Sequence, residues 1–278
     1  MTWKSVLYTK LSTISVQIVN NSVDKVVFLC FREYIQKRND MQKSRPLIVL
    51  RLRSLKVFFL VVAVVVSAVC VPAVTVFAVR ADLPTVVIDA GHGGIDGGVT
   101  GVNTAVKESD LNLVMSKLVG EYFESGGFRV VYTRKNSKGL YRDTDSNKKR
   151  ADMERRAEII RDASPVAVIS IHMNTYSASS RRGAQVFFDA SSEAGKSLAD
   201  TVQEELNRRF NVPDAGREFA ALAADKYILR QTSAPSIIVE CGFLSNPVDE
   251  ANLLRSDYRA EFAYYVFRAV AAFLSGGA

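Results

Sequence analysis

An uncharged apolar segment, residues 57–79, constrains this chain most because it divides the sequence into two parts of different character. A helix of 23 residues rises roughly 34 Å, and the hydrocarbon core of a bilayer is about 30 Å thick. Arg45, Arg51, Arg53 and Lys56 lie shortly before the segment. By the positive-inside rule, this pattern predicts a cytoplasmic amino terminus and an extracytoplasmic remainder.

Residues 57–79 fit either an uncleaved membrane anchor or a cleaved signal peptide. The length of the apolar run favours an anchor, since the apolar region of a signal peptide usually has 7–15 residues. Val76 and Ala78, which are small or branched residues at positions −3 and −1 of a cut after Ala78, and Pro72 late in the run suit cleavage instead. A buried strand or core helix is a third interpretation, which the basic flank and the absence of charge disfavour.

The sequence before the apolar segment has two parts. Residues 1–40 contain short apolar stretches without a clear period, and we interpret them either as upstream sequence preceding a start at Met41 or as a cytoplasmic tail. Residues 41–81 combine a basic n-region with the apolar segment. The remaining residues, 82–278, form the predicted catalytic domain.

The net charge of +7 is distributed unevenly along the chain. Residues 1–81 hold 12 Lys and Arg against 3 Asp and Glu, a net charge of +9, whereas residues 82–278 hold 24 against 26, a net charge of −2. The positive charge therefore reflects membrane topology, and we expect no binding of nucleic acid. Cys241 is the single cysteine after residue 81, which excludes an intramolecular disulfide framework there.

Short β-branched runs alternate with amphipathic segments after residue 84. The runs predict strands at 85–89, 128–133, 166–171, 184–189 and 236–239, and the apolar periodicity predicts helices at 108–125, 152–163, 193–210 and 257–274. This alternation is typical of an α/β domain with a mostly parallel sheet flanked by helices. Functional sites in such sheets form at the carboxyl ends of the strands.

Four side chains with metal-binding or acid–base chemistry occur where predicted elements begin or end. His92 follows the first strand, Glu108 opens the first helix, and His172 and Glu240 end two buried strands. Two imidazoles and one carboxylate are a common ligand set for catalytic zinc, and a second carboxylate can serve as general base. The pattern predicts that the four side chains converge, but it does not decide which glutamate has which role.

Other interpretations of these residues are weaker. The glycine-rich loop, residues 91–98, lacks the Gly-Lys-Ser/Thr ending of a phosphate-binding loop and does not lead directly into a helix, although a turn without any ligand fits it. A Cys241–His172 nucleophilic pair is disfavoured because Cys241 and Glu240 would face opposite sides of a strand. The mixed-charge stretch 135–156 is typical of a solvated loop entering a helix, or it lines a groove.

Four ordered motifs carry a resemblance to a known family. They are VVIDAGHGGIDGG (86–98), KESDLNL (107–113), ISIHMN (169–174) and PSIIVECGFLSNPVD (235–249). In these motifs the chain resembles the zinc-dependent N-acetylmuramoyl-L-alanine amidases, which are peptidoglycan hydrolases, over about residues 84–275. Ser109 stands where many members carry Lys, at a position expected to face solvent.

The resemblance implies a single α/β domain with a six-stranded sheet and one Zn²⁺ held by His92, Glu108 and His172. It further implies that Glu240 is the catalytic carboxylate and that Asn174 contacts substrate. Asp89 and Asp110 would orient the histidines, or have ordinary structural roles. The reaction would be hydrolysis of the amide between the lactyl group of N-acetylmuramic acid and L-alanine.

The chain combines one amino-terminal hydrophobic segment, a single predicted domain and the sequence VECGFLSNP. In these features it looks like the germination-type amidases of spore-forming bacteria, which act on cortex peptidoglycan in the route to muramic δ-lactam. Some relatives need an activator protein, so a protein partner is expected beside peptidoglycan. Two alternatives stay open: another zinc amide hydrolase or peptidase on the same scaffold, and an inactive, membrane-tethered peptidoglycan-binding protein.

Overall fold

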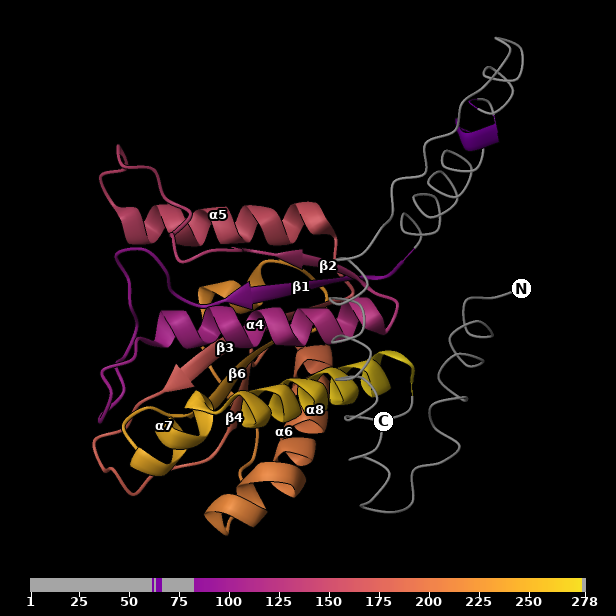
Figure 1. Cartoon of the computed structure of the whole chain (residues 1–278). Coiled ribbons are helices and arrows are strands. Elements are labelled where there is room, and N and C mark those ends of the chain that lie inside the picture. The colour runs from indigo at the N-terminus through magenta and orange to yellow at the C-terminus, as the bar shows by residue number, and fades with distance from the viewer. Residues whose placement is uncertain (1–61, 63, 67–82, 277–278) are drawn as a thin grey trace, which may run out of the picture. The chain divides into compact units, whose positions relative to one another are not determined.

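The computed structural model describes residues 62, 64–66 and 83–276 (Figure 1). The chain divides into two compact units, Met1–Phe77 and Ala78–Ala278. The strands of the second unit are β1 (Thr85–Ala90), β2 (Arg129–Tyr132), β3 (Ala167–Asn174), β4 (Gln185–Phe188), β5 (Leu222–Ala223) and β6 (Ser236–Phe243). Its helices are α4 (Glu108–Ser125), α5 (Lys148–Ala163), α6 (Glu193–Leu206), the π-helix η1 (Asn207–Ala215), the 3-10 helix η2 (Tyr227–Arg230), α7 (Pro247–Leu254) and α8 (Ser256–Leu274).

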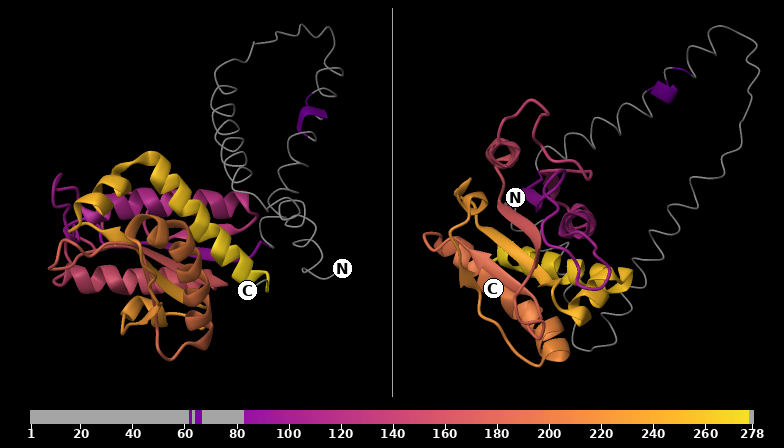
Figure 2. Two further views of the ribbon diagram at one scale, coloured as in Figure 1. Left: turned by 90° about the horizontal axis from the view of Figure 1, so that it is seen from below. Right: turned by 90° about the vertical axis from the view of Figure 1, so that its left-hand side faces the viewer.

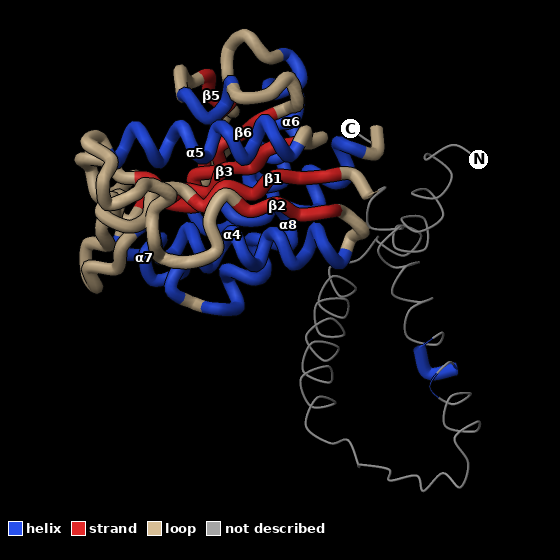
Figure 3. The backbone as a smooth tube through the Cα atoms, turned by 90° about the horizontal axis from the view of Figure 1, so that it is seen from above, coloured by secondary structure: helices blue, strands red, loops and turns tan. Residues whose placement is uncertain are grey.

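The strands form one six-stranded sheet in the order β2-β1-β3-β6-β4-β5. Neighbouring strands are parallel except for β4 and β6, which pair antiparallel. The predicted mostly parallel α/β sheet is thus confirmed. The three central strands β1, β3 and β6 run in the same direction, so their carboxyl ends meet at one edge (Figure 3).

Helices cover both faces of the sheet. Helices α4, α6 and α8 lie on one face, and α5 with η2 lies on the other (Figures 1 and 2). The face beneath α5 and η2 is apolar, because alternate strand residues meet apolar residues of these helices: Val87, Val168 and Ile238 with Ile160, Ala163, Ile228 and Leu229. Burial of this surface favours folding at roughly 25 cal/mol per Å².

The alternation of side chains along strands determines which face carries the polar residues. Val87 and Asp89 share a face of β1, and Ile238 and Glu240 share a face of β6. His172 lies directly opposite Glu240 in the β3–β6 register. The face covered by α5 and η2 therefore ends in Asp89, His172 and Glu240 at the carboxyl edge.

Several boundaries differ from the sequence prediction. Helix α5 starts at Lys148 and not at Asp152, because the Asn147 side chain caps it by accepting a hydrogen bond from the Arg150 amide. The predicted helix 193–210 gives way to a π-helix after Leu206. Strand β5 and helices η2 and α7 were not predicted, since each is too short for a periodic signal.

The predicted membrane or signal segment falls almost wholly outside the described residues. Within it, Val62 and residues 64–66 are helical. Among the described residues, no helix has the length and apolarity needed to cross a membrane. Residues 1–40 and 41–56 also lie outside the described part.

Candidate active site

The glycine-rich loop turns back on itself directly after β1 and presents His92. His92 adopts a left-handed conformation with φ of 58°, and Gly93 and Gly94 follow with φ of 131° and 62°. Such values cost little for glycine but strain a residue with a Cβ, so His92 must be held by its surroundings. Gly91 has no room for a side chain, because a Cβ there would overlap the imidazole ring of His172.

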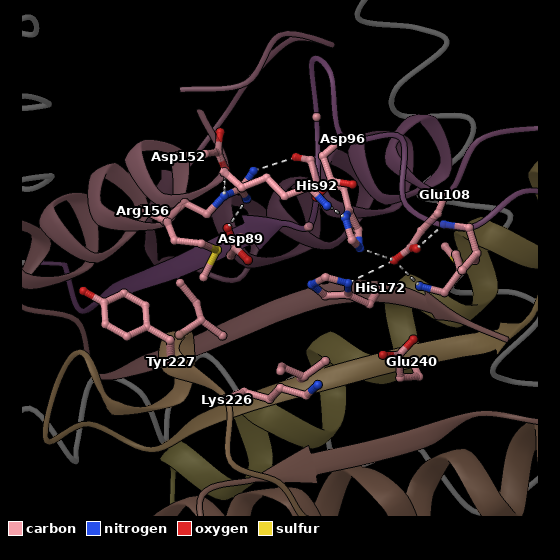
Figure 4. A pocket seen from close by; sticks show the side chains of 18 of the residues that line it. Asp89, His92, Asp96, Glu108, Asp152, Arg156, His172, Lys226, Tyr227 and Glu240 are labelled. Carbon is pink, nitrogen blue, oxygen red and sulfur yellow. Dashed lines mark hydrogen bonds and ion pairs between the residues drawn. The ribbon is translucent and has the colours of Figure 1, made fainter. Parts of the chain in front are cut away.

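His92, Glu108 and His172 form a compact cluster (Figure 4). The Oε1 atom of Glu108 lies 3.2 Å from Nε2 of His92 and 3.0 Å from Nδ1 of His172. One potential ligand atom from each residue lies within 4.8 Å of the others. Two imidazole nitrogens and one carboxylate oxygen at this spacing suit a divalent transition metal, with a further coordination position for water or substrate.

Glu108 is buried and fixed by several donors. Its Oε2 accepts from the Val99 amide at 2.9 Å, and its Oε1 accepts from the Met173 amide and the Asn112 side chain, each at 3.2 Å. Burial raises the pKa of Glu108, but hydrogen bonds from His172 and His92 outweigh burial and bring the pKa well below its usual value. The carboxylate is therefore ionised and preorganised to bind a cation.

Glu240 shares the pocket but has a different environment. Its Oε2 atom is buried and has no hydrogen-bond partner among the described residues. Burial raises the pKa of Glu240 above its usual value, although the neighbouring His172 opposes the shift and the negative charge of Glu108 adds to it. Two carboxylates with pKa values displaced in opposite directions suit two roles, ligand and proton-transfer group.

A buried ion-pair network lies beneath the histidine loop. Arg156, 2% exposed, donates to Asp89 and Asp152 at 2.6 Å each and to the main-chain oxygens of Ala90 and His92 at 2.6 Å each. The Asp89 carboxylate also accepts from Thr133 and Ser170. The network fixes the main chain on both sides of Gly91.

The remaining predicted residues are placed as follows. Asn174 lines the pocket, and its Oδ1 accepts from the Thr175 amide at 2.8 Å. Of the two roles considered for Asp89 and Asp110, the structure fits the ordinary structural one: Asp89 bonds to the Arg156 network, and Asp110 is exposed. The carboxylate beside His92 is Asp96, whose Oδ2 lies 3.1 Å from Nδ1.

Sequence reasoning missed Asp96, although it stands four residues after His92 in the motif VVIDAGHGGIDGG. Burial lowers the pKa of His92, but Glu108 and Asp96 together outweigh burial and raise it above its usual value. Cys241 is free and buried. Part of the mixed-charge stretch borders the pocket, because Tyr141, Lys148 and Lys149 line it.

The cluster opens into a pocket of about 420 Å³ at the carboxyl edge of the sheet. The glycine-rich loop and neighbouring residues of α5 line one side, and Lys226 and Tyr227 line the side away from His92 (Figure 4). The pocket joins a cluster that could hold a metal to a carboxylate whose Oε2 has no hydrogen-bond partner among the described residues, which suits metal-assisted hydrolysis.

Several known proteins are similar to this chain in sequence and in fold. A germination-specific N-acetylmuramoyl-L-alanine amidase of Bacillus subtilis is 28% identical over 186 residues, covering 66% of this chain and 76% of the relative. The CwlD amidase of Clostridioides difficile, solved in complex with the GerS lipoprotein, is 32% identical with a TM-score of 0.66, covering 69% of this chain and 99% of that chain. Amidase AmiC2 of Nostoc punctiforme is 28% identical with a TM-score of 0.59, covering 69% and 97%.

The family model described as N-acetylmuramoyl-L-alanine amidase matches residues 86–272, which span β1 to nearly the end of α8. This range contains the complete cluster and Glu240. The chain therefore belongs to the N-acetylmuramoyl-L-alanine amidase family of hydrolases.

Proposed function

We propose that the protein hydrolyses the amide between the lactyl group of N-acetylmuramic acid and L-alanine in peptidoglycan, using Zn²⁺. The observation that carries the proposal is the buried Oε2 of Glu240, which has no hydrogen-bond partner in the described part of the chain and lies in the same pocket as the His92–Glu108–His172 cluster. A binding protein without activity has no need of a carboxylate kept buried without a partner, which costs free energy.

His92, Glu108 and His172 would hold the zinc ion. The donor set fits this metal, since nitrogen and carboxylate ligands are those of catalytic zinc sites and Glu108 is already ionised. When bound, zinc lowers the pKa of water and polarises a carbonyl group. Asp96 accepts from Nδ1 of His92, leaving Nε2 of that ring for the metal.

Glu240 would act as general base and then as general acid. Its carboxylate takes a proton from the attacking water while the water oxygen bonds to the lactyl carbonyl carbon. When the carbon–nitrogen bond breaks, Glu240 delivers that proton to the alanine nitrogen. The products are a lactyl carboxylate and a free L-alanine amine, and the raised pKa of Glu240 suits a group that both accepts and donates a proton. Asn174 would donate its amide to the substrate.

Location and biological role are inferred from the relatives and the amino-terminal sequence. Peptidoglycan is extracytoplasmic, and residues 57–79 would attach the enzyme to the membrane or serve as its signal. The germination-specific relative supports a role in spore cortex maturation, in the route to muramic δ-lactam. The CwlD amidase was solved in complex with the GerS lipoprotein, which supports a protein partner for this chain.

Digestion of purified peptidoglycan by the full-length protein tests the proposal. We expect zinc-dependent release of peptides that begin with a free L-alanine amine, identified by mass spectrometry, and loss of this release with a chelator. Peptides cut at another bond would identify a different zinc hydrolase. Binding to peptidoglycan without cleavage, with zinc and a candidate partner lipoprotein present, would identify an inactive binding protein.

A further inference from the structure

Three lysines line the pocket, and among the described residues two of them form an ion pair. Lys148 lies 3.8 Å from Asp143, and Lys149 lies 3.4 Å from Asp96. Lys226 lines the same pocket and forms no ion pair with any of the residues that the structure describes. Among the three pocket lysines, Lys226 is therefore the one whose positive charge could pair with a ligand without breaking an ion pair of the described residues.

The main chain fixes the position of Lys226. The residue follows the short strand β5, where the Ala224 amide donates to the Phe188 oxygen of β4 at 2.8 Å. Lys226 then caps η2, since its own oxygen accepts from the Leu229 amide at 3.1 Å. The side chain is exposed, so its main chain is anchored while its ammonium group is free to meet substrate.

The ammonium group faces Glu240. Figure 4 shows the Lys226 side chain extending along the pocket toward Glu240, on the side away from His92. The two charges interact, because Lys226 lowers the pKa of Glu240, although burial has the larger, opposite effect. Lys226 therefore lies on the side of the pocket where Glu240 would protonate the departing amine.

We propose that Lys226 binds a carboxylate of the peptide attached to L-alanine, and so helps to select acidic stem peptides. This rests on the proposed amidase function. Glu240 delivers its proton to the alanine nitrogen, so the peptide leaves along the Glu240 side, where Lys226 is placed. Peptidoglycan stem peptides carry free carboxylates beyond L-alanine, and an ammonium group pairs with a carboxylate as a point charge.

A matched pair of muropeptides tests this role with the full-length enzyme. The two substrates differ only in a carboxylate or a carboxamide on the residue after L-alanine. For K226Q we expect kcat/KM to fall about five- to tenfold on the acidic substrate, mainly through KM, and to stay within about twofold on the amidated one. K226R keeps the charge and should retain most of the preference for the acidic substrate.

K148Q is the control, because Lys148 lines the same pocket but faces Asp143 and the ring of Tyr141. It should leave the ratio of the two kcat/KM values unchanged. An equal loss on both substrates in K226Q, or no loss on either, would overturn the proposal. In both cases cleavage by the wild type leaves the amidase function intact, whereas absence of cleavage by the wild type would contradict the function itself.

Discussion

The Nη2 atom of Arg156 donates a hydrogen bond of 2.6 Å to the main-chain oxygen of His92. Because His92 has φ of 58°, its conformation depends on contacts of this kind. Arg134 adds hydrogen bonds of 2.8 Å to the oxygens of Ala90, Gly91 and Ser109. Two buried guanidinium groups thus hold the turn that carries one potential metal ligand.

Replacing Arg156 should weaken both folding and metal binding. R156M leaves Asp89 and Asp152 buried without their cation, so we expect the free energy of unfolding to fall by about 3–5 kcal/mol. R156K keeps the charge, but an ammonium group cannot donate the same set of hydrogen bonds from one planar group. His92 would then be held less firmly, and we expect zinc affinity to fall roughly tenfold or more. Denaturant unfolding and zinc titration measure the two effects.

The neighbouring Arg155 provides the control. It is partly exposed and pairs with Glu158 at 2.7 Å on the surface of α5. R155M should change the free energy of unfolding by less than about 0.5 kcal/mol and leave zinc affinity unchanged. Equal effects of R155M and R156K on zinc affinity would show that Arg156 does not position His92.

Acid should destabilise the fold through Asp89. Burial raises the pKa of this carboxyl, but Arg156 and the hydroxyls of Ser170 and Thr133 outweigh burial and bring it from 3.8 to about 2. Since the folded pKa is the lower one, the stabilisation is complete above about pH 4 and is lost as the pH falls towards 2. It amounts to about 2 kcal/mol.

Urea unfolding between pH 2 and pH 7 measures this contribution. D89N should be less stable than the wild type at pH 7, because Arg156 loses a charged partner. The variant should lose less additional stability between pH 4 and pH 2, since it has no carboxyl to protonate at this position. Identical pH profiles for the two proteins would contradict the assignment.

The sequence predicted those site residues that are placed by helices and strands. His172 and Glu240 lie near the carboxyl ends of the buried strands β3 and β6, and Glu108 starts a helix, so the positions of the elements alone place them near one edge. Arg156 was missed because it lies beside Ala157 and Ile160 on the buried side of α5, where an arginine is unexpected. Its partner Asp89 is 67 residues away, and no periodicity links the two.

Loops account for the rest of what was missed. Asp96 approaches His92 because the turn between them closes through mutual main-chain hydrogen bonds of Gly93 and Asp96. Lys226 reaches the pocket because β5 adds to the edge of β4. Both depend on tertiary pairing of very short segments, which carries no local sequence signal.

Gly91→Ala should disturb the site without a change of charge. A Cβ at this position would overlap the His172 ring, so the ring or the loop must shift. We expect zinc affinity to fall roughly tenfold or more, as measured by competition with a chelating dye. Gly97→Ala is the control in the same loop, because its Cβ would only reach ordinary contact with Lys107 at 3.4 Å, and zinc affinity should be unchanged.

Glu240→Gln should separate catalysis from metal binding. The amide cannot accept a proton from water, so we expect kcat to fall by about 10²–10⁴ while zinc content is retained. Muropeptide release and metal analysis of the same sample measure both quantities. Glu218→Gln, at an exposed position outside this pocket, should leave both unchanged. Turnover of the Glu240 variant close to that of the wild type would exclude Glu240 as the proton-transfer group.

His172→Ala should have the opposite pattern and lose the metal itself. The change removes one of three donors and one hydrogen bond to Glu108, so we expect the zinc-to-protein ratio after dialysis to fall well below that of the wild type. Met173→Leu is the control, because Met173 is buried on the other face of β3 and the substitution preserves its volume. Full zinc retention by the alanine variant, at the affinity of the wild type, would show that His172 is not a ligand and that the cluster binds its metal through other donors.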